Sequence, residues 1–378
     1  MAKPHKRVMV VFGTRPEAIK MAPVVSALKA NPGIQTSVVV TAQHRHMLDQ
    51  ALSLFGIVPD HDLDAMEPDQ SLPDLFSKIL QGMSSVIAHR KPDLVLVHGD
   101  TTTTFATTLA SFYNKIPVGH VEAGLRTGDL RAPWPEEMNR RLTAPIASLH
   151  FAPTQSSKTN LLAEGVVENS IHVTGNTVID ALLTIVEKIK SDPKLQSELA
   201  AKFPLIDHAK KMILVTGHRR ENYGAGFEKI CQSLITIADR EDTQVVYSLH
   251  LNPNFKIPAE RLLSRHPNIF LIKPQEYLPF VYLMLRSHLI ITDSGGIQEE
   301  APSLGKPVLV TRELTERPEA VDKGTVRLVG TNSSLIVSET FRLLDDEYAY
   351  SAMSRIDNPY GDGHAAERIA RIILTTDA

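Results

Sequence analysis

Short apolar runs recur along the whole chain, separated by polar turns and by segments with helical spacing. Several runs are continuously apolar and rich in β-branched residues, as expected of strands buried on both faces of a parallel sheet. The predicted strands are 8–12, 37–40, 94–97, 117–121, 149–152 and 171–173, then 212–215, 244–249, 268–272, 289–291, 307–310 and 325–329. The clearest predicted helices are 16–30, 101–113, 154–164, 227–238 and 297–304.

This alternation of strand and helix predicts an α/β fold with parallel sheets and right-handed crossovers. With six strand candidates in each half, we expect two doubly wound, Rossmann-like domains that meet near Asn176. A helix over 177–191 leads out of the first domain, and 192–211 is interpreted as a polar connection. Because ligands of such sheets bind beyond the carboxyl ends of the strands, two domains facing each other predict a deep cleft.

Composition narrows the choice of function. The chain has 378 residues and a net charge of −3, which gives no electrostatic reason to expect nucleic acid or an anionic membrane as a partner. The single cysteine, Cys231, excludes an internal disulfide and any multi-cysteine metal site. No apolar run approaches the length of a membrane span, and we expect a cytoplasmic protein that holds no metal.

Carboxylates gather in the stretch 98–141, where predicted strands end in loops. Asp100 follows one strand and Glu122 the next, while Glu136 and Glu137 begin a helix. Such groups at one sheet edge are candidates for acid–base chemistry. The alternative is structural: Asp100 as a helix cap, and the two glutamates as complements to the helix dipole, with Trp134 pinning the loop.

Basic and glycine-rich turns follow other predicted strands and indicate an anionic substrate. Arg15 and Lys20 lie at the start of a helix, and the segment TGHRRE places His218 in a glycine turn. The segment TDSGGIQEE begins a further helix at the glycines, with exposed amides suited to a phosphate. Neither a dinucleotide G-x-G-x-x-G fingerprint nor a Walker A motif is present. The alternative is a solvated turn at Arg15 and at His218, and a well-capped helix with solvated Glu299 and Glu300 in TDSGGIQEE.

These motifs together resemble one enzyme family. The segments FGTRPEAIKMAP, TAQHR, HGDTTTT, GHVEAGLRTGD, PWPEEMNRR, TGNTVIDAL, TGHRRE, HLNPN, PQEYLPF, TDSGGIQEEAPSLGKPVL, TERPEA and NPYGDG resemble the non-hydrolysing UDP-N-acetylglucosamine 2-epimerases. The resemblance extends from about residue 7 to residue 372. It implies a glycosyltransferase-B-like fold whose C-terminal helix returns to the first domain. The expected domains are then 1–176 with 362–378, and 177–361.

The resemblance implies reversible inversion of carbon 2, converting UDP-N-acetylglucosamine to UDP-N-acetylmannosamine. UDP would be eliminated and re-added through a 2-acetamidoglucal, without net redox change and hence without NAD or another cofactor. Loss of UDP gives carbon 1 oxocarbenium character, which makes the carbon 2 proton far more acidic. The family also implies a homodimer that supplies UDP-N-acetylmannosamine for bacterial surface polysaccharide.

Roles carried over by motif position place the catalytic carboxylates and a histidine as follows: Asp100, Glu122, Glu136 and His218. The substrate-binding positions are Arg15, Lys20, Arg140, Phe280, Ser294, Gly295, Gly296, Glu300 and Arg317. Among them, Phe280 matches the residue on the uracil side. Some members are activated by substrate at a second site, whose positions match Gln43, Arg219 and His250. This chain departs from the family pattern at His46, Asp69 and Ser248, which leaves activation open.

Three other functions fit the same motifs. A hydrolysing relative would release free N-acetylmannosamine, a glycosyltransferase would need an acceptor, and a nucleotide-sugar sensor would bind without turnover. The intact carboxylate set weighs against a sensor.

Overall fold

The computed structural model describes residues 5–42, 45–67, 69–315, 317–354 and 358–376, and it divides into two compact units. The first unit comprises 1–181 with 360–378, and the second comprises 182–359. The first division falls inside a helix five residues beyond Asn176, the predicted meeting point. Within the described residues, no helix is long and apolar enough to cross a membrane.

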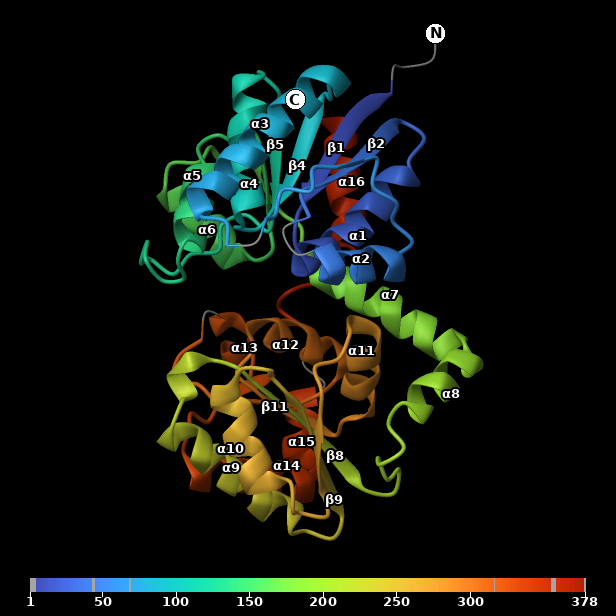
Figure 1. The fold of residues 1–378 in the computed structure, drawn as a ribbon, viewed down its shortest axis with the longest axis vertical. Coiled ribbons are helices and arrows are strands. Elements are labelled where there is room, and N and C mark those ends of the chain that lie inside the picture. Colours follow the sequence, from blue (N-terminus) through green and yellow to red (C-terminus); the bar gives the residue numbers. More distant parts are fainter. Residues whose placement is uncertain (1–4, 43–44, 68, 316, 355–357, 377–378) are drawn as a thin grey trace. The chain divides into compact units, whose positions relative to one another are not determined.

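The first unit is a seven-stranded parallel sheet flanked by helices (Figure 1). Its strands are β1 (Lys6–Phe12), β2 (Ile34–Val40), β3 (His61–Asp62), β4 (Leu94–His98), β5 (Val118–Val121), β6 (Leu149–Ala152) and β7 (Ile171–Val173). Its helices are α1 (Arg15–Lys29), α2 (Arg45–Leu54), α3 (Leu72–Arg90), α4 (Thr102–Tyr113), α5 (Glu136–Thr143), α6 (Gln155–Ala163), the 3-10 turn η1 (Glu168–Ser170) and α16 (Ala365–Thr375).

The second unit is a six-stranded parallel sheet of the same kind. Its strands are β8 (Lys211–Gly217), β9 (Thr243–Leu249), β10 (Ile269–Ile272), β11 (Leu289–Thr292), β12 (Val308–Val310) and β13 (Val326–Leu328). Its helices are α8 (Pro193–Ala201), η2 (Arg220–Asn222), α9 (Ala225–Ala238), α10 (Pro253–Leu263), α11 (Tyr277–Arg286), α12 (Gly295–Glu300), η3 (Ala301–Leu304), α13 (Pro318–Asp322), α14 (Ser333–Asp345) and α15 (Glu347–Ser354), and α7 (Thr177–Ser191) joins the units.

Each sheet has one point at which the strand order reverses. The orders are β3-β2-β1-β4-β5-β6-β7 and β10-β9-β8-β11-β12-β13, so the reversals lie between β1 and β4 and between β8 and β11. Ligands of doubly wound sheets bind at this switch point, beyond the carboxyl ends of the strands. The turns after β1, β4, β8 and β11 are therefore the places to look for a site.

The C-terminal helix α16 belongs to the first unit and lies beside α1 (Figure 1). The Lys6 ammonium donates to the carbonyls of Ile373 (2.9 Å) and Thr376 (2.6 Å) at the end of α16. Asp180 accepts from the backbone N–H of Ala366 (2.8 Å) at its start. The predicted fold class is confirmed: two doubly wound α/β units, with the terminal helix returned to the first.

Local predictions failed where a segment is short or polar. The two exposed residues of β3 carry no apolar signal, so the first sheet has seven strands rather than six. The predicted polar connection 192–211 contains helix α8, capped by the Asp192 carboxylate on the N–H groups of Lys194 and Leu195. Trp134 leaves 66% of its surface exposed and does not pin its loop.

Candidate active site

Glu122 stands at the centre of the carboxylates in the first unit. It follows β5 directly and has a φ of 62°, a left-handed conformation that costs a residue with a β-carbon about 1 kcal/mol or more. Its Oε2 forms an ion pair with Lys20 of α1 and accepts from Asn176 Nδ2 (3.1 Å), which follows β7. Three elements thus converge on one strained and nearly buried carboxylate, which is typical of a functional site.

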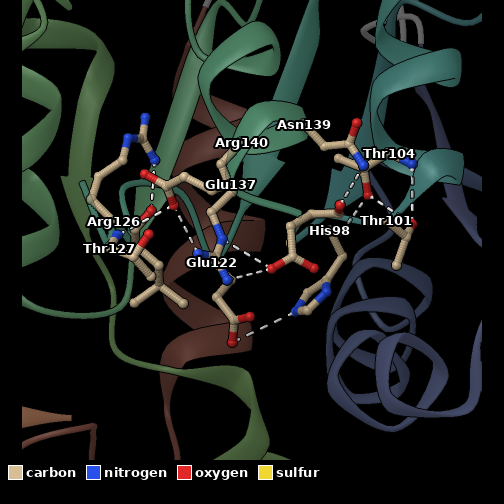
Figure 2. Close-up of polar contacts among 12 residues, drawn as sticks. His98, Thr101, Thr104, Glu122, Arg126, Thr127, Glu137, Asn139 and Arg140 are labelled. Atoms are coloured by element: carbon tan, nitrogen blue, oxygen red, sulfur yellow. Dashed lines mark hydrogen bonds and ion pairs between the residues drawn. The ribbon is translucent and has the colours of Figure 1, made fainter. Parts of the chain in front are cut away.

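The imidazole of His98, at the end of β4, approaches the same oxygen of Glu122 at 3.9 Å (Figure 2). Burial lowers the pKa of His98 to about 4, and the nearby Glu122 charge does not offset that shift. His98 is therefore neutral at physiological pH. It contributes a polar but uncharged wall beside Glu122.

Asp100 lies in the next turn, at the switch point of the first sheet. Arg140 of α5 donates from Nε (2.9 Å) and Nη2 (2.6 Å) to the Oδ2 atom of Asp100. Asn139 Nδ2 donates to the Asp100 carbonyl (2.8 Å), so α5 is attached to this turn at two points. The helix α4 is capped instead by Thr101, whose hydroxyl accepts from Thr104 N–H. The capping role considered for Asp100 is thus wrong, and its carboxylate faces α5.

The two adjacent glutamates of α5 have different environments. Glu137 is fully buried and accepts from the backbone N–H groups of Thr127 (3.2 Å) and Gly128 (3.4 Å) and from Arg140 (3.0 Å), so it anchors the irregular loop before α5 (Figure 2). Glu136 is half-buried, and its Oε2 has no hydrogen-bond partner among the described residues. An unpaired buried carboxylate oxygen is costly unless a ligand satisfies it. Glu136 is therefore the better candidate for contact with substrate.

Lys20 and Arg140 both contact carboxylates. Lys20 pairs with Glu122, and Arg140 pairs with Asp100 and Glu137. Arg15 is half-buried at the start of α1, in the turn after β1. In that turn the N–H groups of Gly13 and Thr14 already donate to Glu17, so an anion arriving there would meet the Arg15 side chain rather than these amides.

His218 occupies the switch point of the second sheet, after β8. Its Nδ1 lies 3.3 Å from Oδ1 of Asp293, which follows β11. The Asp293 carboxylate is fully buried and also accepts from the backbone N–H groups of His218 (2.8 Å) and Arg219 (2.9 Å). Burial lowers the pKa of His218, and the Asp293 charge opposes that shift. Asp293 thus orients an imidazole whose side chain is 42% exposed.

Two of the three residues predicted for a second substrate site, Arg219 and His250, lie near His218. The ring of His250 stacks on that of His218, with centroids 5.7 Å apart, and Arg219 is the next residue along the chain. Gln43, the third member of this set, lies outside the described residues.

The remaining predicted nucleotide contacts lie around α12. Ser294 is its N-cap residue, and a β-carbon on Gly295 would lie 3.8 Å from the Arg317 guanidinium. Arg317 forms an ion pair with Glu299, and Glu300 accepts from Tyr277 (2.5 Å) of α11, the helix that carries Phe280. Both glutamates are buried, so the solvated alternative is wrong. Gly296 is the second residue of α12.

Four residues of these sites were not identified from the sequence: Glu17, His98, Asn176 and Asp293. Each lies within three residues of a strand end or in the first turn of a helix, where a polar side chain is ambiguous between capping and function. Only the strand order, which brings distant turns together, distinguishes a capping role from a functional role. Within the described ranges, no group of three or more His, Cys, Asp or Glu side chains is placed to hold a metal ion.

Comparison with known proteins identifies the family. The family model described as UDP-N-acetylglucosamine 2-epimerase matches residues 26–374. The UDP-N-acetylglucosamine 2-epimerase of Escherichia coli K12 is 62% identical over 364 residues, 96% of this chain and 97% of the relative.

Two solved structures extend the likeness to three dimensions. A Neisseria meningitidis UDP-GlcNAc 2-epimerase bound to UDP-GlcNAc aligns with a TM-score of 0.90 and 53% identity, covering 98% of this chain and 100% of that one. The Methanocaldococcus jannaschii enzyme in complex with UDP-GlcNAc and UDP aligns with a TM-score of 0.80 and 33% identity, covering 98% and 100%. The resemblance read from the motifs is confirmed: the chain is an enzyme that belongs to the UDP-N-acetylglucosamine 2-epimerase family.

Proposed function

We propose that this enzyme interconverts UDP-N-acetylglucosamine and UDP-N-acetylmannosamine by eliminating UDP and adding it back. In the forward direction the bond from carbon 1 to the UDP oxygen breaks, carbon 2 loses its proton, and 2-acetamidoglucal and UDP remain bound. The proton then returns to the opposite face of carbon 2, and the bond to UDP forms again. Atoms and electrons balance without a redox cofactor.

The observation that carries this proposal is the placement of Asp100 and Glu122 after two neighbouring strands of one sheet, with Glu136 on the helix α5 that is bonded to the turn of Asp100. Glu122 is held by Lys20 and Asn176, and Asp100 is held by Arg140 through a single oxygen. The other oxygen of Asp100 has no partner within the described part of the chain. Carboxylates held in this way are suited to take and return a proton at a sugar carbon.

In the proposed reaction, the second unit binds most of the leaving group, and Arg15 of the first unit adds one contact. His218, oriented by Asp293, lies near the diphosphate and stabilises the charge that develops on the departing oxygen. Arg15, Ser294, Gly295, Gly296, Glu300, Arg317 and Phe280 bind UDP. We further propose that the enzyme works as a homodimer and supplies UDP-N-acetylmannosamine for surface polysaccharide.

Proton NMR of UDP-N-acetylglucosamine turnover in deuterium oxide tests the reaction. We expect UDP-N-acetylmannosamine to accumulate to a stable ratio, with deuterium at carbon 2 of both sugars and no added acceptor or cofactor. Free N-acetylmannosamine formed at the catalytic rate would identify a hydrolase instead. Product without deuterium would exclude proton exchange at carbon 2.

A further inference from the structure

Glu17 is a buried carboxylate that the proposed reaction does not use. It is the third residue of α1 and leaves only 3% of its surface exposed, although glutamates are almost never buried without partners. Its Oε2 accepts from the N–H of Gly13 (3.0 Å) and from the N–H and hydroxyl of Thr14 (both 2.8 Å). These bonds fix the turn between β1 and α1, which carries Arg15.

The other oxygen of Glu17 reaches across the switch point to the neighbouring turn. Oε1 accepts from the Thr101 hydroxyl (2.8 Å), which lies next to Asp100 and caps α4. Thr101 and the adjacent Thr104 appear together at the start of α4 in Figure 2. One carboxylate therefore joins the turn of β1 to the turn of β4, although Glu17 and Thr101 are 84 positions apart in sequence.

The turn of β1 packs closely against the turn of β2 and the start of α4. A β-carbon on Gly13 would lie 2.1 Å from Thr41 Oγ1 and 2.4 Å from Thr103 Oγ1, and these two hydroxyls hydrogen-bond to each other at 2.7 Å. Gly13 is therefore required by close approach, and the segment HGDTTTT supplies hydroxyls on the facing side.

The bonding of Glu17 differs from that of a structural ion pair. Glu17 makes no ion pair with any residue that the structure describes, and its two oxygens receive two N–H donors and three hydroxyl donors, the longest of these bonds coming from Thr104 Oγ1 at 3.5 Å. Burial raises the pKa of Glu17 to about 7, against the effect of these donors. Since each donor belongs to one of the two turns, loss of the acceptor would release both turns together.

We propose that Glu17 is a positioning residue of the epimerase reaction. Its carboxylate holds the turn of Arg15 against the turn of Asp100, so that the side chains of Arg15 and Asp100 keep the relative position that the substrate requires. This proposal rests on the proposed function, because it assigns Asp100 to catalysis and Arg15 to UDP. Misplacement of a reacting group by about 1 Å can cost about a hundredfold in rate.

The test compares kcat and KM of Glu17→Gln, Thr101→Val and the double variant with those of matched controls. Asp180→Asn removes the charge of another buried carboxylate that binds a backbone N–H, and Thr108→Val removes another buried α4 hydroxyl, bonded to the Thr104 carbonyl at 2.8 Å. We call Glu17→Gln and Thr101→Val the bridge variants, because they change the contact that joins the two turns. We expect each bridge variant to lower kcat at least about tenfold more than its control at comparable melting temperature. KM should change less than kcat.

Two readouts separate positioning from stability. The double variant should be no more than about twofold slower than the slower single variant, because Glu17→Gln already weakens the connection between the turns that Thr101→Val breaks. Thr101→Ser, which keeps the hydroxyl, should restore most of the activity lost in Thr101→Val. If Glu17→Gln does not fold, the Val and Ser variants of Thr101 decide alone.

The proposal is overturned if the bridge variants match their controls in kcat, or if the effects of Glu17→Gln and Thr101→Val multiply. A wild-type enzyme that does not epimerise UDP-N-acetylglucosamine refutes the proposed function itself. The two failures are therefore distinguishable.

Discussion

At the scale of single residues, the environments of Asp100, Glu122 and Glu136 predict how much each carboxylate contributes to kcat. Asp100→Asn, Glu122→Gln and Glu136→Gln each remove a proton acceptor while keeping size, so we expect kcat to fall by about two to four orders of magnitude. Asp93→Asn is the control, because Asp93 pairs with Arg7 on the surface before β4. Near-normal turnover in all three variants, measured by NMR, would refute the proposed mechanism.

The dyad of His218 and Asp293 leads to a second prediction. The Asp293 charge raises the pKa of His218 against the effect of burial, so Asp293→Asn should lower that pKa further. NMR titration of the His218 ring protons measures the midpoint, and we expect it to move to lower pH as kcat falls. An unchanged midpoint in the variant would show that Asp293 does not control the imidazole.

The positions of the candidate site residues were predictable only in part. The motifs singled out Asp100, Glu122, Glu136 and His218, because strand ends and glycine turns are visible in a sequence. Glu17 was hidden because a glutamate three positions after a threonine has the appearance of an ordinary capping box. Its second oxygen contacts Thr101, and no local pattern indicates that contact.

At the scale of elements, the buried histidines of β4 and β5 make stability depend on pH. Burial lowers the pKa of His98 to about 4 and that of His120 to about 3, from the usual 6.5. As pH falls, these histidines are therefore protonated in the unfolded chain before they are protonated in the folded chain. Their contribution to the free energy of unfolding is complete above pH 6.5 and falls as pH decreases toward 4. Glu17 has the opposite sign: its pKa is raised from 4.5 to about 7, so its contribution is lost as pH rises through that range.

Replacement of His120 by glutamine isolates one of these histidines. Between pH 4.5 and 6, each protonation difference changes the free energy of unfolding by up to about 1.4 kcal/mol per pH unit. We therefore expect the free energy of unfolding of His120→Gln to change less steeply with pH than that of the wild type, by roughly this amount per pH unit. Urea unfolding read by hydrogen exchange in β4 and β5 peptides measures the slope, and equal slopes would contradict the prediction.

Elements were easier to predict than their connections. Continuous apolar runs such as 94–97 and 289–291 became β4 and β11 with nearly the same bounds. The two-residue strand β3 and the helix α8 were missed, because neither carries an apolar face long enough to be recognised. The strand order that joins the turns of β1 and β4 is a property of the whole sheet and has no local signal.

At the scale of the whole molecule, the two units divide the candidate groups by chemistry. The carboxylates and their basic partners belong to the first unit, while Asp293 with His218 and the groups around α12 belong to the second. In the proposed function, the first unit therefore recognises the sugar, and the second unit supplies every proposed UDP contact except Arg15. Variants of the first-unit carboxylates should affect turnover and spare UDP affinity, whereas variants around α12 should weaken UDP binding.

This division predicts how UDP affinity responds to substitution. Ser294→Ala removes the hydroxyl at the N-cap of α12, and Glu300→Gln disturbs the bond to Tyr277, so each should weaken UDP binding about tenfold. Glu122→Gln, in the other unit, should bind UDP within about twofold of the wild type, although its turnover is lost. Isothermal calorimetry with UDP measures all three. A loss of UDP affinity in Glu122→Gln as large as that in Glu300→Gln would mean that the carboxylates of the first unit also hold the nucleotide, and the assignment of UDP to the second unit would be wrong.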